Sequence, residues 1–330
     1  MTPTWVTDQQ QNVYVNDMLR YIKGGLLVPP AAYNPLTVAA APGAGLTTQS
    51  SPVIIEGGED GVTEIFSLVG AFDAATLAAV QDRFTVRIRD TAYRRTLMNR
   101  PILASQVFGS NLQPFFLTES ILLEGQQTME LAFFNNSVAG NAVYRMAFES
   151  RKFQASALAN RVTTDEIGLL RQRKTFLNPY WLTNDLQSPY PLVIPAGGQL
   201  NVTFKNTRDY FLILQYIMCQ ARSTGAAGDL QEMFSFVIRD PRTGRPLMNQ
   251  PVTLNTGTGT SNFPFVLPTA LMVDPITAID VTFFNLVTDQ PTEVWFTFFG
   301  TGIFVADTNP WESFPQLEEA WPGGMRRGAP

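Results

Sequence analysis

The composition describes a globular chain rich in strands and turns: of 330 residues, 45% are hydrophobic and 15% charged, with 24 Gly and 23 Pro. The net charge of −5 argues against a surface devoted to nucleic acid, which needs massed Lys and Arg. Histidine is absent and Cys219 is the only cysteine, which excludes His-based acid–base pairs, cysteine metal clusters and an intramolecular disulfide. We predict that the chain has no catalytic residue, cofactor, metal or enzymatic activity. We also predict that Cys219 is buried.

Residues 1–49 are expected to form an N-terminal helix followed by an extended arm. Thr7 or Asp8 can cap a helix over 9–23, which Gly24 and Gly25 would end. The first residues lack the basic and apolar regions of a secretory signal. The apolar runs are shorter than the roughly 20 residues needed to span a bilayer. We therefore expect synthesis in a host cytoplasm.

An internal duplication organises the rest of the chain. Residues 84–135 align with 234–285 without a gap at a spacing of 150, and 16 of these 52 positions are identical. Allowing one residue of slip, Val143, Phe148 and Phe153 match Val294, Phe299 and Phe304. The two copies are predicted to span 50–155 and 188–306.

Each copy has the pattern of short β-strands. In "FTVRIRD", Phe84, Val86 and Ile88 alternate with polar residues, the period of two that turns one face inward. Clusters of Gly, Pro and Asn separate such segments at intervals of about 10 residues, which is typical of a sandwich or barrel. The predicted fold is all-β: two tandem jelly-roll or Greek-key β-sandwiches, flanked by the N-terminal helix and extended terminal arms.

Residues 156–187 are predicted to be a linker that contains a short helix. "TTDE" at 163–166 is a capping-box pattern that would begin this helix. The chain concentrates basic residues here: Arg151, Lys152, Arg161, Arg171, Arg173 and Lys174. They are interpreted as an exposed linker face, with contact to an acidic partner or to packaged nucleic acid as a less favoured alternative. Residues 307–330 are predicted to be a C-terminal arm.

The motif D-x4-R-x-L-M-N-x-P occurs once in each copy and predicts a β-hairpin. It comprises Asp90, Arg95, Asn99 and Pro101, repeated as Asp240, Arg245, Asn249 and Pro251. The Asp and Arg could pair across the base of the turn, and the Asn could bind the following backbone. An Arg beside a carboxylate lowers its pKa, so a structural role is favoured over a catalytic one. A carboxylate-dependent hydrolase, with Glu119 or Glu124 meeting Asp90, stays open as a third alternative.

The last strand of the second copy is apolar on both faces in "VWFTFF". Under the one-residue slip, Phe296 and Phe298 replace Arg145 and Ala147 of the first copy. Such a strand needs two covers: its own core, and the sister copy, an arm or another subunit. We predict an interface with other chains that contains Phe296 and Phe298 together with the tryptophans of the arms, Trp5, Trp311 and Trp321.

The segments "FSFVIRDPRTGRPLMNQPV", "FPFVLPTALMVDPITAIDVTFFN" and "VWFTFFGTGIF" resemble β-sandwich repeats of bacteriophage virion proteins. The duplication and the N-terminal helix also resemble double jelly-roll capsid proteins of tailless, membrane-containing phages. The resemblance implies a structural virion protein, in the capsid or decorating it. The arms and their tryptophans predict in addition a homo-oligomer, such as a trimer, in which each arm inserts into neighbouring subunits. The implied partners are other copies of the chain and other virion proteins, with no small-molecule substrate. The alternative is a receptor- or glycan-binding module of a virion.

Overall fold

The computed structural model describes residues 26–32, 36–44, 46–56, 61–91, 94–110, 112–125, 127–154, 161–186, 188–207, 210–223, 234–240 and 243–304. The predicted helix over 9–23, the C-terminal arm and Trp5, Trp311 and Trp321 lie outside these residues. No helix within the described ranges is long and apolar enough to cross a bilayer.

The first copy is a sandwich of two antiparallel sheets. One sheet has the order β1-β11-β5-β9, with β2 also pairing β11. The other has the order β3-β10-β6-β7, with β4 on β10 and β8 on β6. The strands are β1 (Leu26–Ala32), β2 (Leu36–Val38), β3 (Thr48–Gln49), β4 (Val53–Glu56), β5 (Gly61–Phe72), β6 (Phe84–Asp90), β7 (Arg95–Thr96), β8 (Ile102–Leu103), β9 (Phe115–Glu124), β10 (Thr128–Asn135) and β11 (Ala142–Gln154).

The second copy repeats this arrangement with nine described strands in place of eleven. Its sheets have the orders β12-β20-β15-β18, with β13 on β20, and β14-β19-β16-β17. Strands distant in sequence are neighbours in all four sheets, as in a jelly roll, so the predicted all-β sandwich class is confirmed. The strands are β12 (Leu177–Thr183), β13 (Leu192–Ile194), β14 (Gln199–Lys205), β15 (Tyr210–Ser223), β16 (Phe234–Arg239), β17 (Val252–Thr253), β18 (Phe265–Val273), β19 (Ala278–Asn285) and β20 (Thr292–Phe304).

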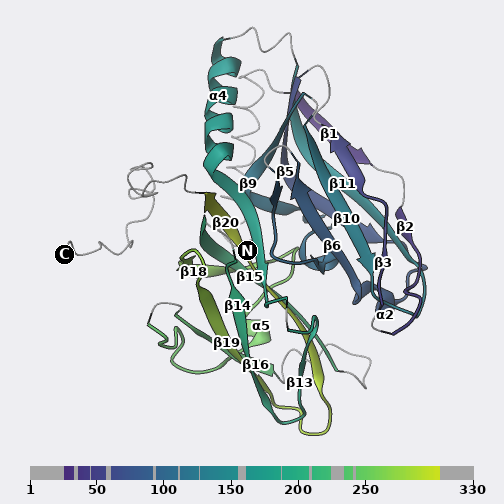
Figure 1. Cartoon of the computed structure of the whole chain (residues 1–330), viewed down its shortest axis with the longest axis vertical. Helices are drawn as coiled ribbons and strands as arrows, with labels where there is room; N and C mark the ends of the chain where they lie inside the picture. Colours follow the sequence, from purple (N-terminus) through teal and green to yellow (C-terminus); the bar gives the residue numbers. More distant parts are fainter. Residues whose placement is uncertain are drawn as a thin grey trace, which may run out of the picture.

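Helices connect the strands and make up little of the fold. The short segments α2 (Ala78–Gln81), η1 (Ala104–Gln106) and α5 (Leu254–Gly257) lie between strands. The longest described helix is α4 (Arg161–Phe176), which stands beside the first sandwich and runs directly into β12 (Figure 1). Because α4 begins at Arg161, "TTDE" lies inside it and does not cap it. The capping-box prediction is therefore wrong.

Both sandwiches begin earlier than the sequence repeat indicates, the first by three strands and the second by one. β12 occupies part of the segment predicted as linker, and β1, β2 and β3 occupy part of the predicted N-terminal arm. These edge strands pair with β20, β11 and β10 of their own sandwiches. Sequence similarity missed them because edge strands of the two copies share little beyond backbone hydrogen bonding.

A buried asparagine closes the same corner of each sandwich. The Asn135 amide donates to the carbonyls of Val38, Ala39 and Gly140 at 3.0–3.3 Å. Asn285 does the same for Ile194, Pro195 and Gln290 at 3.0–3.4 Å. Such a side-chain amide donates hydrogen bonds to backbone carbonyls at the point where the pairing between strands stops. The identity of these two positions is therefore structural.

A pair of equivalent glycines permits the same close backbone approach in both copies. A Cβ at Gly109 would lie 2.2 Å from the Gln113 carbonyl oxygen, and one at Gly259 would lie 1.9 Å from that of Phe263. Each glycine also exchanges hydrogen bonds with the strand beside it, Gly109 with β5 and Gly259 with β15. No residue with a side chain fits either position without moving the backbone.

The register of the last strands corrects the predicted one-residue slip. Ala142 pairs with Val38 and Thr292 with Ile194, so β11 and β20 remain 150 residues apart. Met146 and Phe148 are the counterparts of Phe296 and Phe298, and all four face their own cores. The assignment of Phe296 and Phe298 to an interface with other chains is therefore wrong: both are 0% exposed inside the second sandwich.

The outer face of β20 is covered by the first sandwich. Trp295, Thr297 and Phe299 alternate with the core residues and are at most 1% exposed. Phe299 belongs to the hydrophobic cluster of the first sandwich, together with Trp181 and Met218 from the second. The sister copy is thus the second cover that this strand requires, and one apolar core continues across the boundary.

Candidate functional site

The first repeated hairpin binds the free edge of β12. Trp181 donates its backbone N–H to the Leu97 carbonyl at 2.9 Å. The Asn99 side chain then pairs with Thr183 as a backbone would, donating to its carbonyl at 2.7 Å and accepting from its N–H at 3.0 Å. Leu97 and Met98 are at most 2% exposed. The motif therefore joins the two sandwiches.

Arg100 and Tyr190 extend this contact beyond β12. Arg100 donates to the carbonyls of Asp185 and Ser188 at 3.0 and 2.9 Å, and its guanidinium lies 4.9 Å from the centre of the Tyr190 ring. Burial lowers the pKa of Arg100 and raises that of Tyr190. The Tyr190 hydroxyl accepts the Leu103 N–H at 3.1 Å.

Gln106 anchors the first sandwich to β20. Its amide donates to the Trp295 carbonyl at 2.7 Å and accepts from the Thr297 hydroxyl at 2.8 Å. Beside it, Phe115 of β9 lies 4.8 Å from Phe299 and 5.9 Å from Trp181, measured between ring centres. Hydrogen bonds fix the orientation of the interface, while these aromatic side chains bury apolar surface in it.

The base of the first hairpin is tied to the end of α4. The Asp90 carboxylate forms an ion pair with Lys174 at 2.8 Å, and both side chains are at most 3% exposed. Arg95 donates to the carbonyls of Lys174 and Thr175, which the last turn of a helix leaves without helical partners. A cation at a helix C-terminus is also electrostatically favourable. The motif Asp and Arg therefore serve α4 as well as the turn.

The second hairpin has a left-handed residue at the same position as the first but lies in a different environment. Gly244 adopts the left-handed conformation (φ 65°), and its counterpart Arg94 does so as well (φ 52°). Asp240 accepts the Thr243 hydroxyl at 2.8 Å and exchanges backbone bonds within the turn. Arg245, Asn249 and Pro251 are exposed. Asn99 and Pro101 are partly buried in the first copy.

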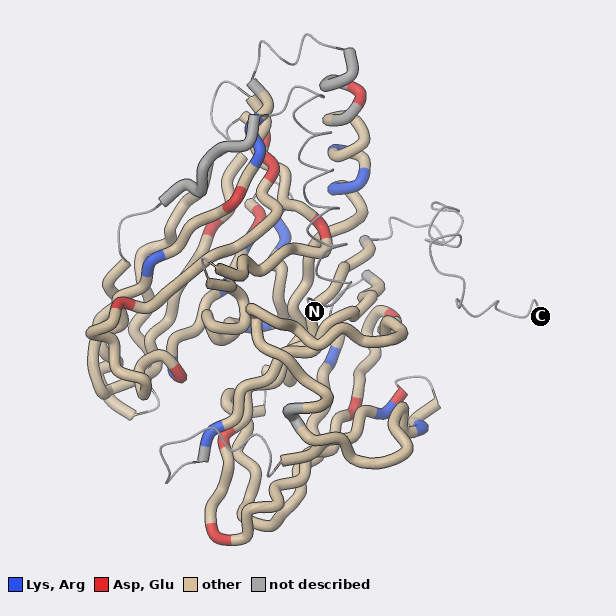
Figure 2. Tube along the Cα trace, turned by 180° about the vertical axis from the view of Figure 1, so that it is seen from behind, with Lys and Arg blue, Asp and Glu red and all other residues tan. Residues whose placement is uncertain are grey.

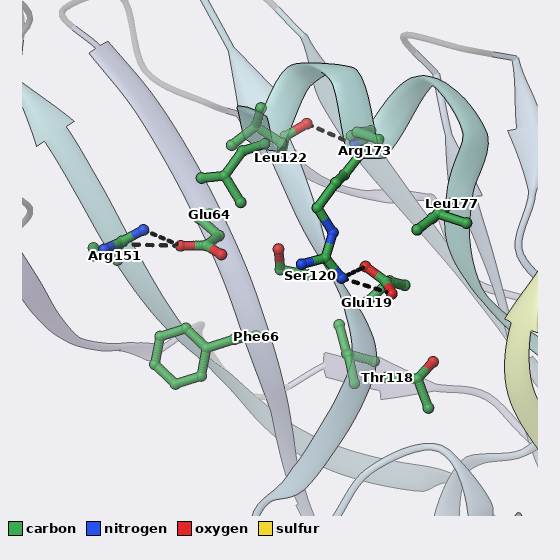
Figure 3. Close-up of a pocket in the computed structure, with 12 residues that line it drawn as sticks. Glu64, Phe66, Thr118, Glu119, Ser120, Leu122, Arg151, Arg173 and Leu177 are labelled. Carbon is green, nitrogen blue, oxygen red and sulfur yellow. Dashed lines mark hydrogen bonds and ion pairs between the residues drawn. The ribbon is translucent and has the colours of Figure 1, made fainter. Parts of the chain in front are cut away.

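A charged pocket of about 280 Å³ lies between α4 and the outer face of β5, β9 and β11 (Figure 3). Arg151 pairs with Glu64 at 2.9 Å where both are nearly inaccessible, and Arg173 binds both oxygens of Glu119 at 2.9–3.0 Å. Lys174 donates to the Leu122 carbonyl at 2.7 Å. Ordered ion pairs with additional hydrogen bonds are needed to offset the cost of burying these charges.

The predicted basic patch is largely neutralised within the molecule. Of its members, Arg151, Arg171, Arg173 and Lys174 pair with Glu64, Glu124, Glu119 and Asp90 respectively. In Figure 2, blue positions are scattered along the trace among tan and red ones. A cation held by a carboxylate has less attraction for a phosphate, so these four residues do not favour nucleic-acid binding.

The structure brings Asp90, Glu119 and Glu124 to the same helix, but each has its own cation. Among them, burial raises the pKa of Glu119, while Arg173 acts in the opposite direction. Burial also lowers the pKa of Lys174 against the effect of Asp90. The described residues contain no group of three or more His, Cys, Asp or Glu that could hold a metal ion.

Sequence reasoning missed most of the residues that join the two sandwiches beside the first hairpin. Trp181, Tyr190 and Gln106 lie outside the repeated motif, and two of them are in the segments around the predicted linker boundary. One usable signal was the lone Trp181 in "LNPYWLT". A large aromatic residue in an apolar run is more consistent with burial than with a linker.

Comparison with known proteins gives only distant similarities. No protein-family model matches the chain, and no curated protein matches its sequence. Among solved structures, PNGF-II is 12% identical with a TM-score of 0.33, covering 87% of this chain and 68% of its own. PNGase F, a glycosylasparaginase from Flavobacterium meningosepticum, is 9% identical with a TM-score of 0.34, covering 82% and 96%.

A viral capsid protein is also among the similar structures. VP2 of the infectious bursal disease virus subviral particle is 7% identical with a TM-score of 0.21, and the alignment covers 89% of this chain and 50% of VP2. The prediction that the chain is not an enzyme is contradicted by the PNGase neighbours, and we withdraw it. At these TM-scores, neither similarity assigns an activity to this chain.

We expect Asn99→Ala to lower the free energy of unfolding by about 1–3 kcal/mol, because it leaves the N–H and carbonyl of Thr183 without their partners. The matched control Asn249→Ala, at the exposed equivalent position, should change it by less than about 0.5 kcal/mol. Urea denaturation of both variants as dilute full chains measures the difference. A change for Asn99→Ala as small as the one expected for the control would show that the Asn99 contact contributes nothing measurable to stability.

We expect the Glu119 carboxyl to titrate above the ordinary value of 4.5, because its burial outweighs the attraction of Arg173. In Arg173→Met the pKa should rise further, since the opposing cation is gone. Carbon-detected NMR of selectively labelled glutamate follows both titrations. A Glu119 pKa below 4.5 would contradict this description of the pocket.

Proposed function

We propose that this protein is a structural component of a bacteriophage particle. It assembles as a homo-oligomer, with a trimer as the expected form, into or onto the capsid. The observation that carries this proposal is the use of the repeated hairpin as a docking element between jelly rolls. The contact between the two sandwiches of one chain is of a kind that can be repeated between chains, and a contact repeated in this way builds an assembly.

The rigidity of the pair supports this role. A shell subunit must hold its domains in a fixed orientation, because neighbouring subunits align only if the angle between domains is constant. Here Trp181, Phe115 and Phe299 form a continuous core between the sandwiches. The ion pairs of Arg83 with Glu293 and of Arg222 with Asp82 add polar contacts across the same boundary. The distant similarity to a capsid protein is compatible with this role and does not establish it.

The test is the composition of purified particles from cells in which this chain is produced during infection. The proposal predicts that quantitative mass spectrometry finds the chain in the particle fraction, at hundreds of copies for a shell or decoration protein. Absence from particles, with the chain remaining in the cell lysate, would overturn the proposal.

A further inference from the structure

The second hairpin presents the same docking motif as the first, but without the partner that the first one has. Leu97 is 2% exposed and its counterpart Leu247 is 46% exposed. Phe115 is buried against Trp181, whereas Phe265 is only partly buried. The two hairpins share a backbone hydrogen bond: the Leu97 N–H donates to the Ile88 carbonyl, and the Leu247 N–H donates to the Ile238 carbonyl. Among the residues that the structure describes, one copy of the motif is therefore occupied and the other is formed but open.

The partner of the first hairpin has an equivalent in the first sandwich. β12 is an edge strand on β20, and β1 is the edge strand on β11. Thr183 pairs with Thr297, and Ala32 pairs with Ala147, which lies 150 residues before Thr297. Ala32 is thus the register equivalent of the residue that binds Asn99. In the described part of the chain, β11 is the only strand that pairs with β1.

We propose that the hairpin over 243–251 of one molecule docks on the β1 edge of a second copy of this chain, with Asn249 binding the backbone of Ala32. The contact repeats between molecules the contact that Asn99 makes with Thr183 within one. β1 lies in the first sandwich and β16, which leads into the hairpin, lies in the second (Figure 1). The association is therefore head to tail, and such contacts close into rings when the rotation permits.

The sequence difference between the two receiving faces fits a contact that forms after folding. The outer face of β20 carries Trp295, Thr297 and Phe299, whereas the corresponding positions of β11 are Arg145, Ala147 and Glu149. A sheet face that stays exposed to water in the free chain needs polar residues to avoid non-specific association. The proposed contact is accordingly more polar than the internal one, with backbone pairing and Leu247 as its main features.

The inference rests on the proposed function and can fail separately from it. Two variants that each add one cysteine to the buried Cys219, Asn249→Cys and Ala32→Cys, are made in full chains that differ in tag length, mixed, and treated with a short bis-maleimide. We expect covalent dimers that contain one chain of each kind. The control mixture replaces Asn249→Cys with Leu286→Cys, which is 60% exposed outside the hairpin, and should give none.

A second measurement uses Leu247→Asp. Because Leu247 is 46% exposed, its thermal unfolding should match the parent chain. Light scattering should show association weakened about tenfold or more, the loss expected for a central interface residue. If the parent chain associates, but no cross-link between 249 and 32 forms and Leu247→Asp associates normally, this interface is wrong while the proposed function stands. A parent chain that is monomeric at all concentrations would overturn both.

Discussion

The burial of the outer face of β20 under the first sandwich is the contact on which the rest of the molecule depends. Trp181, Phe115 and Phe299 meet there with ring centres 4.6–5.9 Å apart. Each large apolar side chain buried in this way contributes about 1.5–3 kcal/mol. A hydrogen bond contributes only about 1 kcal/mol net. Each buried ring therefore contributes more than a single hydrogen bond, and the directional hairpin hydrogen bonds set the orientation of the two sandwiches.

The two copies share the architecture of their sheets and differ in which of their surfaces are buried. Asn135 with Asn285 and Gly109 with Gly259 keep the same structural roles. The hairpins share a left-handed residue and one backbone hydrogen bond, yet one is buried against the sister sandwich and the other is exposed. The charged residues of α4 are a further difference between the two copies. They pair with carboxylates of the first sandwich and so position the helix, and the second copy has no described equivalent.

The sequence predicts the repeating framework well and the contacts between the copies poorly. Alternation in "FTVRIRD" correctly predicts β6, because one-sided burial imposes a period of two on a strand. Edge strands such as β1 and β12 were missed, since main-chain hydrogen bonds hold them and leave little pattern. Phe296 and Phe298 were assigned to the wrong face, because a gap of one residue in an alignment reverses every side chain of a strand. The partners of Asn99 and Asp90 depend on tertiary packing that no local pattern encodes.

The central claim is that the first hairpin closes the edge of β12, and hydrogen exchange at two amides tests it most directly. The N–H groups of Trp181 and Thr183 point away from β20 and toward Leu97 and Asn99. If the hairpin is docked, both amides should exchange as slowly as those in the middle of β20, which open only with the whole domain. Exchange at the rate of an open edge strand would contradict the account.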